Sequence, residues 1–178
     1  MSRRLGKGLD ALIPSLEVGD DDKVVEIPLA EIRPNPYQPR KTFDEESIRE
    51  LAESIRQHGV IQPIIVRSAV KGYEIIAGER RFRASQLIGN EKIPAVVRDF
   101  SDQQVMEIAL IENLQREDLN AIELAQAYQS IMDKFNLTQE ELSLKVGKSR
   151  SHIANFLRLL ALPAEVKEHV SRGTLSMG

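Results

Sequence analysis

Apolar and polar positions along the first hundred residues follow the two periods that distinguish strands from helices. Short runs rich in β-branched residues predict strands at residues 24–27, 60–66, 73–77 and 93–97. Between the first two runs, Ile48, Leu51, Ala52 and Ile55 have the i, i+3, i+4, i+7 spacing of a half-buried helix. A second helix is predicted over residues 79–88. This alternation predicts a small mixed α/β domain.

The rest of the chain predicts helices only. Ser101 with Gln104, Asn120 with Glu123, and Thr138 with Glu141 have the spacing of capping pairs, which mark three helix starts. Further helices are predicted to begin near Ser149 and after Pro163. The expected fold class is therefore α+β, with a flexible tail at 1–23, a mixed α/β domain at 24–118 and an all-helical domain at 119–178.

Composition excludes several classes of protein. The chain has 178 residues and no cysteine, so disulfides, zinc–thiolate sites and thiol nucleophiles are excluded. Only 4% of residues are aromatic and tryptophan is absent, which argues against a surface built from stacked rings. No apolar run approaches the roughly 18 residues of a membrane helix, and the N-terminus lacks the apolar block of a signal peptide. We expect a cytoplasmic protein with no membrane partner.

Charge is distributed unevenly along the helical part. Residues 101–133 contain seven acidic residues and one basic residue, whereas residues 134–158 contain five basic and two acidic residues. A segment of net charge +3 therefore follows one of net charge -6, although the whole chain carries only -3. A local basic segment of this kind favours an anionic partner.

The segment Gly78-Glu-Arg-Arg-Phe-Arg-Ala84 falls at a predicted strand-to-helix turn. Glycine lets the backbone approach a ligand, the helix N-terminus favours an anion, and Arg80 and Arg81 supply forked donors for phosphate. The alternative is structural: the arginines form ion pairs with acidic helices while Phe82 packs in the core. The residues alone favour neither interpretation. The segment is not a P-loop, because it lacks the Lys-Ser/Thr pair.

The segment Glu112-Asn-Leu-Gln-Arg-Glu117 ends an apolar helix. Carboxylate and amide oxygens at a helix C-terminus would favour a divalent cation, and Arg116 could bind a further phosphate. The alternative is a solvated helix end with an i, i+4 pair between Glu112 and Arg116, worth about 0.3–0.5 kcal/mol. Taken alone, the segment favours this alternative.

The most specific local pattern lies in residues 138–160. Leu142 and Val146 would bury one helix, Gly147 permits a tight turn, and Ile153 begins the buried face of the next, as a helix-turn-helix requires. Arginine can contact guanine and asparagine can contact adenine, while serine and lysine suit phosphates. We therefore predict DNA binding, through Thr138, Gln139, Lys148, Ser149, Arg150, Ser151, His152 and Asn155.

Taken together and in this order, several segments resemble one family, the ParB chromosome-partitioning proteins. They are LGKGLDALI, RPNPYQPRK, GERRFRA, ENLQRE, KSRSHIANFLRLL and the terminal GTLSMG, and they cover residues 5–178. The resemblance implies a ParB/sulfiredoxin-like N-terminal domain that binds CTP with Mg²⁺ and slowly hydrolyses it to CDP and phosphate in a DNA-stimulated reaction. It also implies a CTP-gated clamp that loads at an inverted-repeat centromere site and spreads on DNA. The family has a C-terminal dimerisation domain, so we expect this chain to stop inside the DNA-binding region.

The resemblance also assigns roles to residues. Gly78, Glu79, Arg80 and Arg81 match the family's arginine-rich nucleotide motif, and Asn113, Gln115 and Arg116 match its phosphate and metal motif. Glu112 and Asn113 would coordinate the metal, and Glu79 or Glu112 would orient the attacking water. Gln38 and Arg40 lie in a segment near the nucleotide and are a weaker assignment.

The resemblance also implies binding partners, and it leaves three alternative functions. Residues 5–13 resemble the segment that stimulates a ParA-type ATPase, and the family implies a homodimer, condensin recruitment and nucleoid association. One rival is a helix-turn-helix regulator without nucleotide turnover, and another is a nucleoid-occlusion protein that binds a different DNA sequence. A sulfiredoxin-type enzyme is a third, but its redox chemistry needs a cysteine, and the chain has none.

Overall fold

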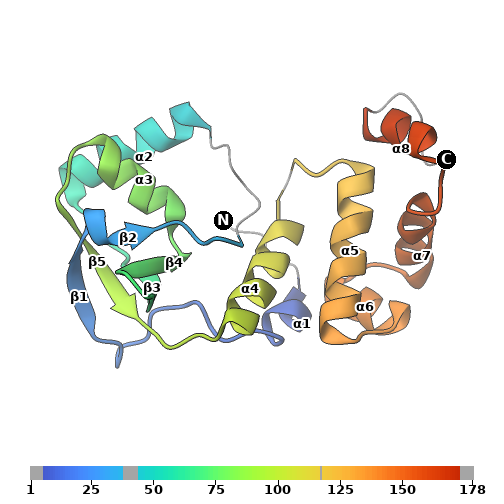
Figure 1. The fold of residues 1–178 in the computed structure, drawn as a ribbon, viewed down its shortest axis with the longest axis horizontal. Helices are drawn as coiled ribbons and strands as arrows, with labels where there is room; N and C mark the ends of the chain where they lie inside the picture. Colours follow the sequence, from blue (N-terminus) through green and yellow to red (C-terminus); the bar gives the residue numbers. More distant parts are fainter. Residues whose placement is uncertain (1–5, 38–43, 117, 173–178) are drawn as a thin grey trace. The chain divides into compact units, whose positions relative to one another are not determined.

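The chain divides into two units. The computed structural model describes residues 6–37, 44–116 and 118–172. We call residues 16–105 the sheet unit, and residues 1–15 together with 106–178 the helical unit. Helix α4 (Asp102–Leu114) begins in the first and continues into the second. The predicted fold class, a mixed α/β part followed by an all-helical part, is confirmed (Figure 1).

The sheet unit is built on a mixed sheet of strand order β1-β5-β3-β4-β2. The pairs β1–β5 and β3–β4 are antiparallel, and β3–β5 and β2–β4 are parallel. Helices α2 and α3 lie side by side (Figure 1), and Phe82 of α3 packs into the core of the sheet. The elements are β1 (Val24–Pro28), η1 (Leu29–Glu31), β2 (Ile32–Arg33), α2 (Glu45–His58), β3 (Ile64–Ser68), β4 (Tyr73–Ala77), α3 (Glu79–Leu87) and β5 (Lys92–Val97).

Strand β3 is shorter than predicted at its N-terminal end. The apolar run predicted a strand over 60–66, but the strand begins at Ile64. Pro63 has no N–H to donate to a ladder, and the carbonyls of Gln62 and Pro63 instead accept hydrogen bonds from Arg81 Nη1, at 2.6 Å and 2.7 Å. Two of the four residues lost from the predicted strand, Gln62 and Pro63, therefore bind an arginine side chain.

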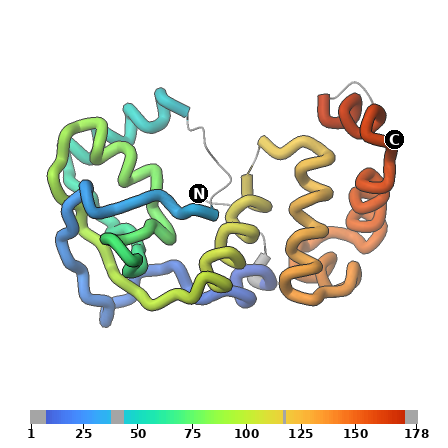
Figure 2. The backbone as a smooth tube through the Cα atoms, in the orientation of Figure 1, coloured from blue at the N-terminus to red at the C-terminus, as the bar shows by residue number. Residues whose placement is uncertain are grey.

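The helical unit contains, besides the end of α4, helices α1 (Gly6–Asp10), α5 (Ala121–Phe135), α6 (Gln139–Val146), α7 (Arg150–Leu159) and α8 (Ala164–Ser171). Their order can be followed along the chain in Figure 2. The predicted capping pairs Asn120–Glu123 and Thr138–Glu141 both form complete capping boxes at the starts of α5 and α6. Ile131, Leu142 and Ile153 bring α5, α6 and α7 together in one core, and each is fully buried.

The N-terminal segment packs into this core, where the sequence predicted a flexible tail. Leu9 of α1 is 0% exposed and belongs to the same cluster as Ile131 and Leu142. Gly8 explains the close approach, because a Cβ at this position would lie 2.7 Å from the Cα of Lys145 on α6. Two glycines in a short helix are unfavourable in isolation but allow the backbones of α1 and α6 to come together.

We expect Gly8→Ala to weaken the docking of α1 by about 1–3 kcal/mol, the typical cost of overpacking. The added methyl group must displace either α1 or the backbone of α6. Hydrogen exchange of the Leu9, Leu12 and Ile13 amides will report the change as faster exchange. Ala11→Ser, at an exposed position of the same segment, is the control. Equal protection in the wild type and in Gly8→Ala would show that the contact does not hold α1.

Candidate functional site

Helices α6 and α7 form the predicted helix-turn-helix. Gly147 ends α6 in the left-handed conformation at φ 70°, and Ser149 caps α7 by accepting a hydrogen bond from the His152 backbone N–H at 3.0 Å. Thr138 caps α6 in the same way. The hydroxyls of Thr138 and Ser149 therefore already accept helix-capping bonds, although both residues are exposed. The caps position the first turn of each helix at the surface.

An open depression lies along the outward face of α7. It measures about 670 Å³ and is lined by Gln139, Arg150, Ser151, Ala154, Asn155 and Arg158. No carboxylate is among these lining residues. Four of the residues predicted for DNA binding thus line one groove, and apart from Ala154 the side chains that line it are cationic, amide or hydroxyl groups.

The groove also contains Arg158, which was not predicted for this site. Its Nη1 donates a hydrogen bond of 3.2 Å to Asn155 Oδ1, so the cation and the amide are held together. The signal was present in the sequence: Arg158 lies four residues after Ala154 and three after Asn155, on the same helix face. Lys148, in the turn before α7, is exposed.

His152 lies elsewhere than predicted. Its ring is not among the residues that line the groove; it packs between Tyr128 of α5 and Phe156 of its own helix. The physical reason is helical spacing: His152 and Phe156 lie one turn apart on the side that faces α5, while Ser151 and Asn155 lie one turn apart on the outer side.

In the sheet unit, the turn from β4 to α3 brings its backbone close to the side chain of Ile64. Gly78 adopts φ 105° and precedes the first residue of α3, and a Cβ there would lie 2.5 Å from Ile64 Cγ2. The position therefore requires glycine. The first backbone N–H groups of α3 follow directly, and these are the groups that bind anions at helix N-termini.

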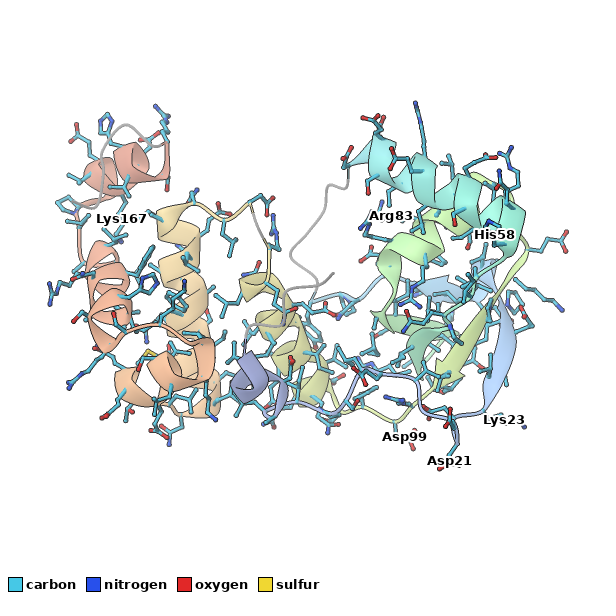
Figure 3. All side chains as sticks on the ribbon, turned by 180° about the vertical axis from the view of Figure 1, so that it is seen from behind. Asp21, Lys23, His58, Arg83, Asp99 and Lys167 are labelled. Carbon is cyan, nitrogen blue, oxygen red and sulfur yellow. The ribbon has the colours of Figure 1, made fainter. Side chains whose placement is uncertain are left out.

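The arginines of this turn differ in their surroundings. Arg80 is exposed and donates to Ser47 Oγ on α2. Arg81 is half-buried, donates to two backbone carbonyls, and burial lowers the pKa of its guanidinium. Arg83 pairs with Glu79 at 3.2 Å and is labelled in Figure 3. Arg80 is thus the most exposed of these three arginines.

Glu79 is an unusual buried carboxylate. It is 9% exposed, and Arg83 donates to its Oε1, but Oε2 is buried without a hydrogen-bond partner among the residues that the structure describes. A buried, unpaired carboxylate oxygen is unfavourable in an apoprotein. A donor supplied by a ligand or its water would relieve that cost.

The second predicted motif lies at the C-terminal end of α4, in the helical unit. Arg116 forms a bidentate ion pair with Asp118, with Nε–Oδ1 at 3.1 Å and Nη2–Oδ2 at 3.0 Å. The hydrogen bond to Asp118 raises the pKa of Arg116. Arg116 Nη1 also reaches Asn113 Oδ1 at 3.4 Å, and Gln115 is exposed.

Two predicted nucleotide residues, Gln38 and Arg40, lie outside the described residues. In the described part of the chain, no group of three or more His, Cys, Asp or Glu side chains is arranged to hold a metal. The donor chemistry of Glu112 and Asn113 nevertheless suits Mg²⁺, which binds through one or two side-chain oxygens together with water and phosphate. Over the same described residues, no helix has the length and apolar character needed to cross a bilayer.

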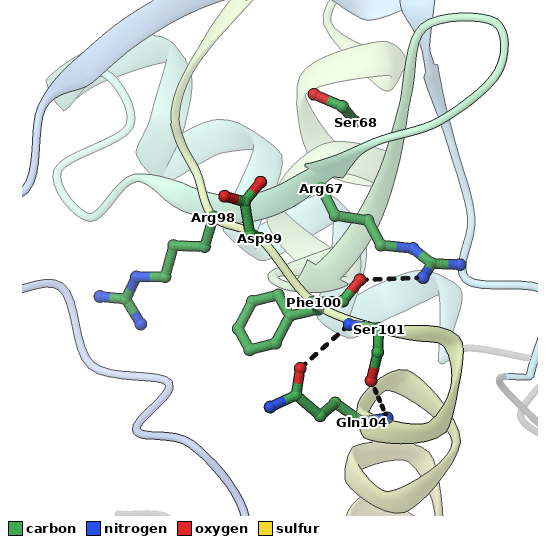
Figure 4. A pocket seen from close by; sticks show the side chains of 7 residues that line it. All are labelled: Arg67, Ser68, Arg98, Asp99, Phe100, Ser101 and Gln104. Carbon is green, nitrogen blue, oxygen red and sulfur yellow. Dashed lines mark hydrogen bonds between the residues drawn. The ribbon is translucent and has the colours of Figure 1, made fainter.

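A further depression of about 360 Å³ lies where β3 and β5 meet the start of α4 (Figure 4). Its two arginines are both engaged. Arg67 bonds to Glu74, to Asp102 and to the Phe100 carbonyl. Arg98 points away toward the segment before β1 and bonds to Asp22 and the Glu17 carbonyl. Both arginines of this depression are therefore already bound by groups of the protein itself.

Two family models together match most of the chain. The model of the ParB N-terminal domain matches residues 15–114, and that of the ParB HTH domain matches residues 117–178. Stage 0 sporulation protein J of Bacillus subtilis is 54% identical over 178 residues, which cover 100% of this chain and 63% of that protein. A nucleoid occlusion protein of Halalkalibacterium halodurans is 50% identical over 175 residues, with 98% and 62% covered.

A solved structure also matches. It is the C-terminally truncated chromosome-partitioning protein ParB from Caulobacter crescentus, complexed to the centromeric parS site. The match has a TM-score of 0.68 and 46% identity, and it covers 86% of this chain and 80% of that chain. The chain spans less than two thirds of the length of the Bacillus subtilis and Halalkalibacterium halodurans proteins. With two family models matching nearly end to end, the chain belongs to the ParB family.

Proposed function

We propose that this chain is the nucleotide- and DNA-binding part of a chromosome-partitioning protein that binds a parS-like inverted repeat. The observation that carries the proposal is the groove of α7, which gathers Arg150, Asn155 and Arg158 with no lining carboxylate. Arginine and asparagine on the outer face of a recognition helix are the side chains that contact guanine and adenine. Residues 119–178 are the proposed DNA-binding domain and residues 24–118 the CTP-binding domain.

We assign the nucleotide to the two motifs named by the family resemblance. The turn at Gly78 offers backbone N–H groups and the exposed Arg80 to phosphates, as the chemistry of a helix N-terminus favours. Arg81 would have to leave its carbonyl partners to join them. Asn113, Gln115 and Arg116 are the proposed phosphate and metal group, with Gln38 and Arg40 as additional contacts.

Mg²⁺ would be held by the oxygens of Glu112 and Asn113. When bound, the ion would neutralise charge on the phosphates and orient them. The protein supplies a carboxylate to orient the attacking water, either Glu79, whose Oε2 is buried with no hydrogen-bond partner among the described residues, or Glu112. Arg80 and Arg116 stabilise the negative charge of the phosphates.

The proposed gate is a two-state device. CTP can close a clamp only if it binds the closed arrangement better than the open one. We propose that the helix bearing Glu112 moves relative to the sheet and pairs with a second subunit when CTP is present. Crosslinks across α4 that form equally with and without CTP and DNA would contradict this gate.

Partners follow from the same proposal. Residues 5–13 are the proposed binding element for a ParA-type ATPase, and Leu9 of this element is buried in the core of the helical unit. Condensin recruitment, a homodimer and a cytoplasmic, nucleoid-associated location are proposed for the whole protein on the basis of the family.

The test is phosphate release from CTP and Mg²⁺ by the 178-residue chain, with a parS duplex or a scrambled duplex. We expect faster release with parS. Glu112→Gln should slow release by about a hundredfold or more, the range of a lost acid–base group, while Glu91→Gln, at an exposed position, should match the wild type. Binding of parS without any turnover would favour the regulator without CTPase activity.

Nucleoid occlusion is the second candidate function, because relatives of that name share about half of the residues of this chain. DNA preference separates the two. A chain that selects parS from a pool of random duplexes supports partitioning, and one that selects an unrelated inverted repeat supports nucleoid occlusion.

A further inference from the structure

His152 has two separate attachments in the recognition helix. Its backbone N–H donates to the capping hydroxyl of Ser149 at 3.0 Å, and its ring Nε2 lies 3.2 Å from the hydroxyl oxygen of Tyr128 on α5. Arg150 and Ser151 lie in sequence between Ser149 and His152. The groove residues Arg150 and Ser151 therefore lie between two fixed points, the Ser149 cap and the His152 ring.

The Tyr128 hydroxyl belongs to a compact aromatic cluster. Tyr128 is 4% exposed, and its ring meets those of His152 and Phe156 edge to face, each with centroids 5.9 Å apart. The rings of His152 and Phe156 are 4.6 Å apart. Edge-to-face packing is directional. The cluster therefore sets the rotation of α7 about its own axis as well as its distance from α5.

Rotation of α7 decides what its outer face presents. Because the backbone of a helix is rigid, a small rotation of α7 about its axis turns every side chain of the groove by the same angle. Apolar contacts such as those of Ile153 fix the depth of the helix but are less directional than a hydrogen bond. The hydrogen bond between His152 and Tyr128 therefore fixes the rotation of α7 about its axis.

We propose that His152 is a positioning residue for sequence-specific DNA binding: its bond to Tyr128 fixes the rotation of α7, and with it the direction of Arg150 and Asn155. The inference rests on the proposed function, because it concerns the same DNA-binding groove. It explains why a histidine in the recognition helix faces inward.

The surroundings keep the ring neutral near neutral pH. Burial lowers the pKa of His152, and Lys148, from the turn before α7, lowers it further. Tyr128 is the titratable group that faces it from α5, and burial raises the pKa of that phenol. Among the described residues, no carboxylate forms a hydrogen bond or ion pair with the ring. A neutral ring with its proton on Nδ1 accepts from the Tyr128 hydroxyl at Nε2.

The test compares two substitutions of His152 whose side-chain amides lie at different distances from the backbone. Glutamine places a polar atom near the position of Nε2, whereas asparagine reaches only to the position of Nδ1. The quantity measured is the ratio of affinities for a parS duplex and a scrambled duplex at one salt concentration. We expect His152→Asn to lower this ratio about threefold to tenfold, the range of one lost hydrogen bond, and His152→Gln to restore most of it.

Tyr128→Phe is the second variant, because it keeps the ring and removes only the hydroxyl. It should lower the ratio as His152→Asn does, and the two changes combined should cost no more than either alone. Equal ratios in the wild type and in His152→Asn, or equal losses in the asparagine and glutamine variants, would overturn the inference. A wild type without preference for parS would overturn the proposed function itself, and the inference with it.

Discussion

Arg150→Ala will lower the affinity for a parS duplex by about tenfold to a hundredfold, the value of one guanidinium contact with a guanine. The side chain is exposed in the groove of α7, so its removal leaves no buried group unpaired. Binding to a scrambled duplex should change much less, because that binding depends on phosphate contacts spread over many cations. Fluorescence anisotropy with both duplexes measures the two affinities.

The control is Lys134→Ala, which removes one positive charge from the same helical unit outside the groove. We expect this variant to keep the preference for parS. Arg150→Ala should also bind CTP as tightly as the wild type. Loss of both DNA and CTP binding in Arg150→Ala would mean that the proposed division of the chain into two domains is wrong.

Arg80→Ala will weaken CTP binding by about tenfold to a hundredfold, the range for a charged hydrogen bond to phosphate. Arg80 is exposed and donates to Ser47, so the variant should keep the fold. Isothermal titration calorimetry measures the affinity, and the thermal unfolding temperature checks the fold.

Two controls separate the role of the Arg80 charge from that of its Ser47 contact and from that of positive charge in general. Ser47→Ala removes the partner of Arg80 on α2 but keeps the cation, and Arg49→Ala removes an exposed cation of α2. Both variants should bind CTP nearly as the wild type does. If Arg49→Ala weakened binding as much as Arg80→Ala, the effect would be one of general charge and the assigned role of Arg80 would be refuted.

Much of this architecture was predictable because its signals are local. Capping pairs such as Asn120–Glu123 lie within one turn of each other and need no tertiary context. The same is true of Gly147, whose left-handed conformation joins α6 to α7. The groove residues Arg150 and Asn155 follow from helical spacing once those two helices are known.

The rest depends on contacts between residues far apart in the sequence. The start of β3 depends on the Gln62 and Pro63 carbonyls being used by Arg81. The inward direction of His152 depends on Tyr128, which lies 24 residues away. The docking of Leu9 depends on helices more than a hundred residues later in the chain. Spacing within a segment contains no information about such partners.

We propose above that the arginine-rich turn at Gly78 and the end of α4, with its carboxylate and amide oxygens, bind the same nucleoside triphosphate. A binding competition among CTP, ATP, GTP and UTP with Mg²⁺, run with the parS duplex and without DNA, tests it most directly. Selective binding of CTP that parS strengthens, and that both Arg80→Ala and Asn113→Ala weaken, is the predicted result. Equal binding of all four nucleotides, or CTP binding unaffected by Asn113→Ala, would contradict the account.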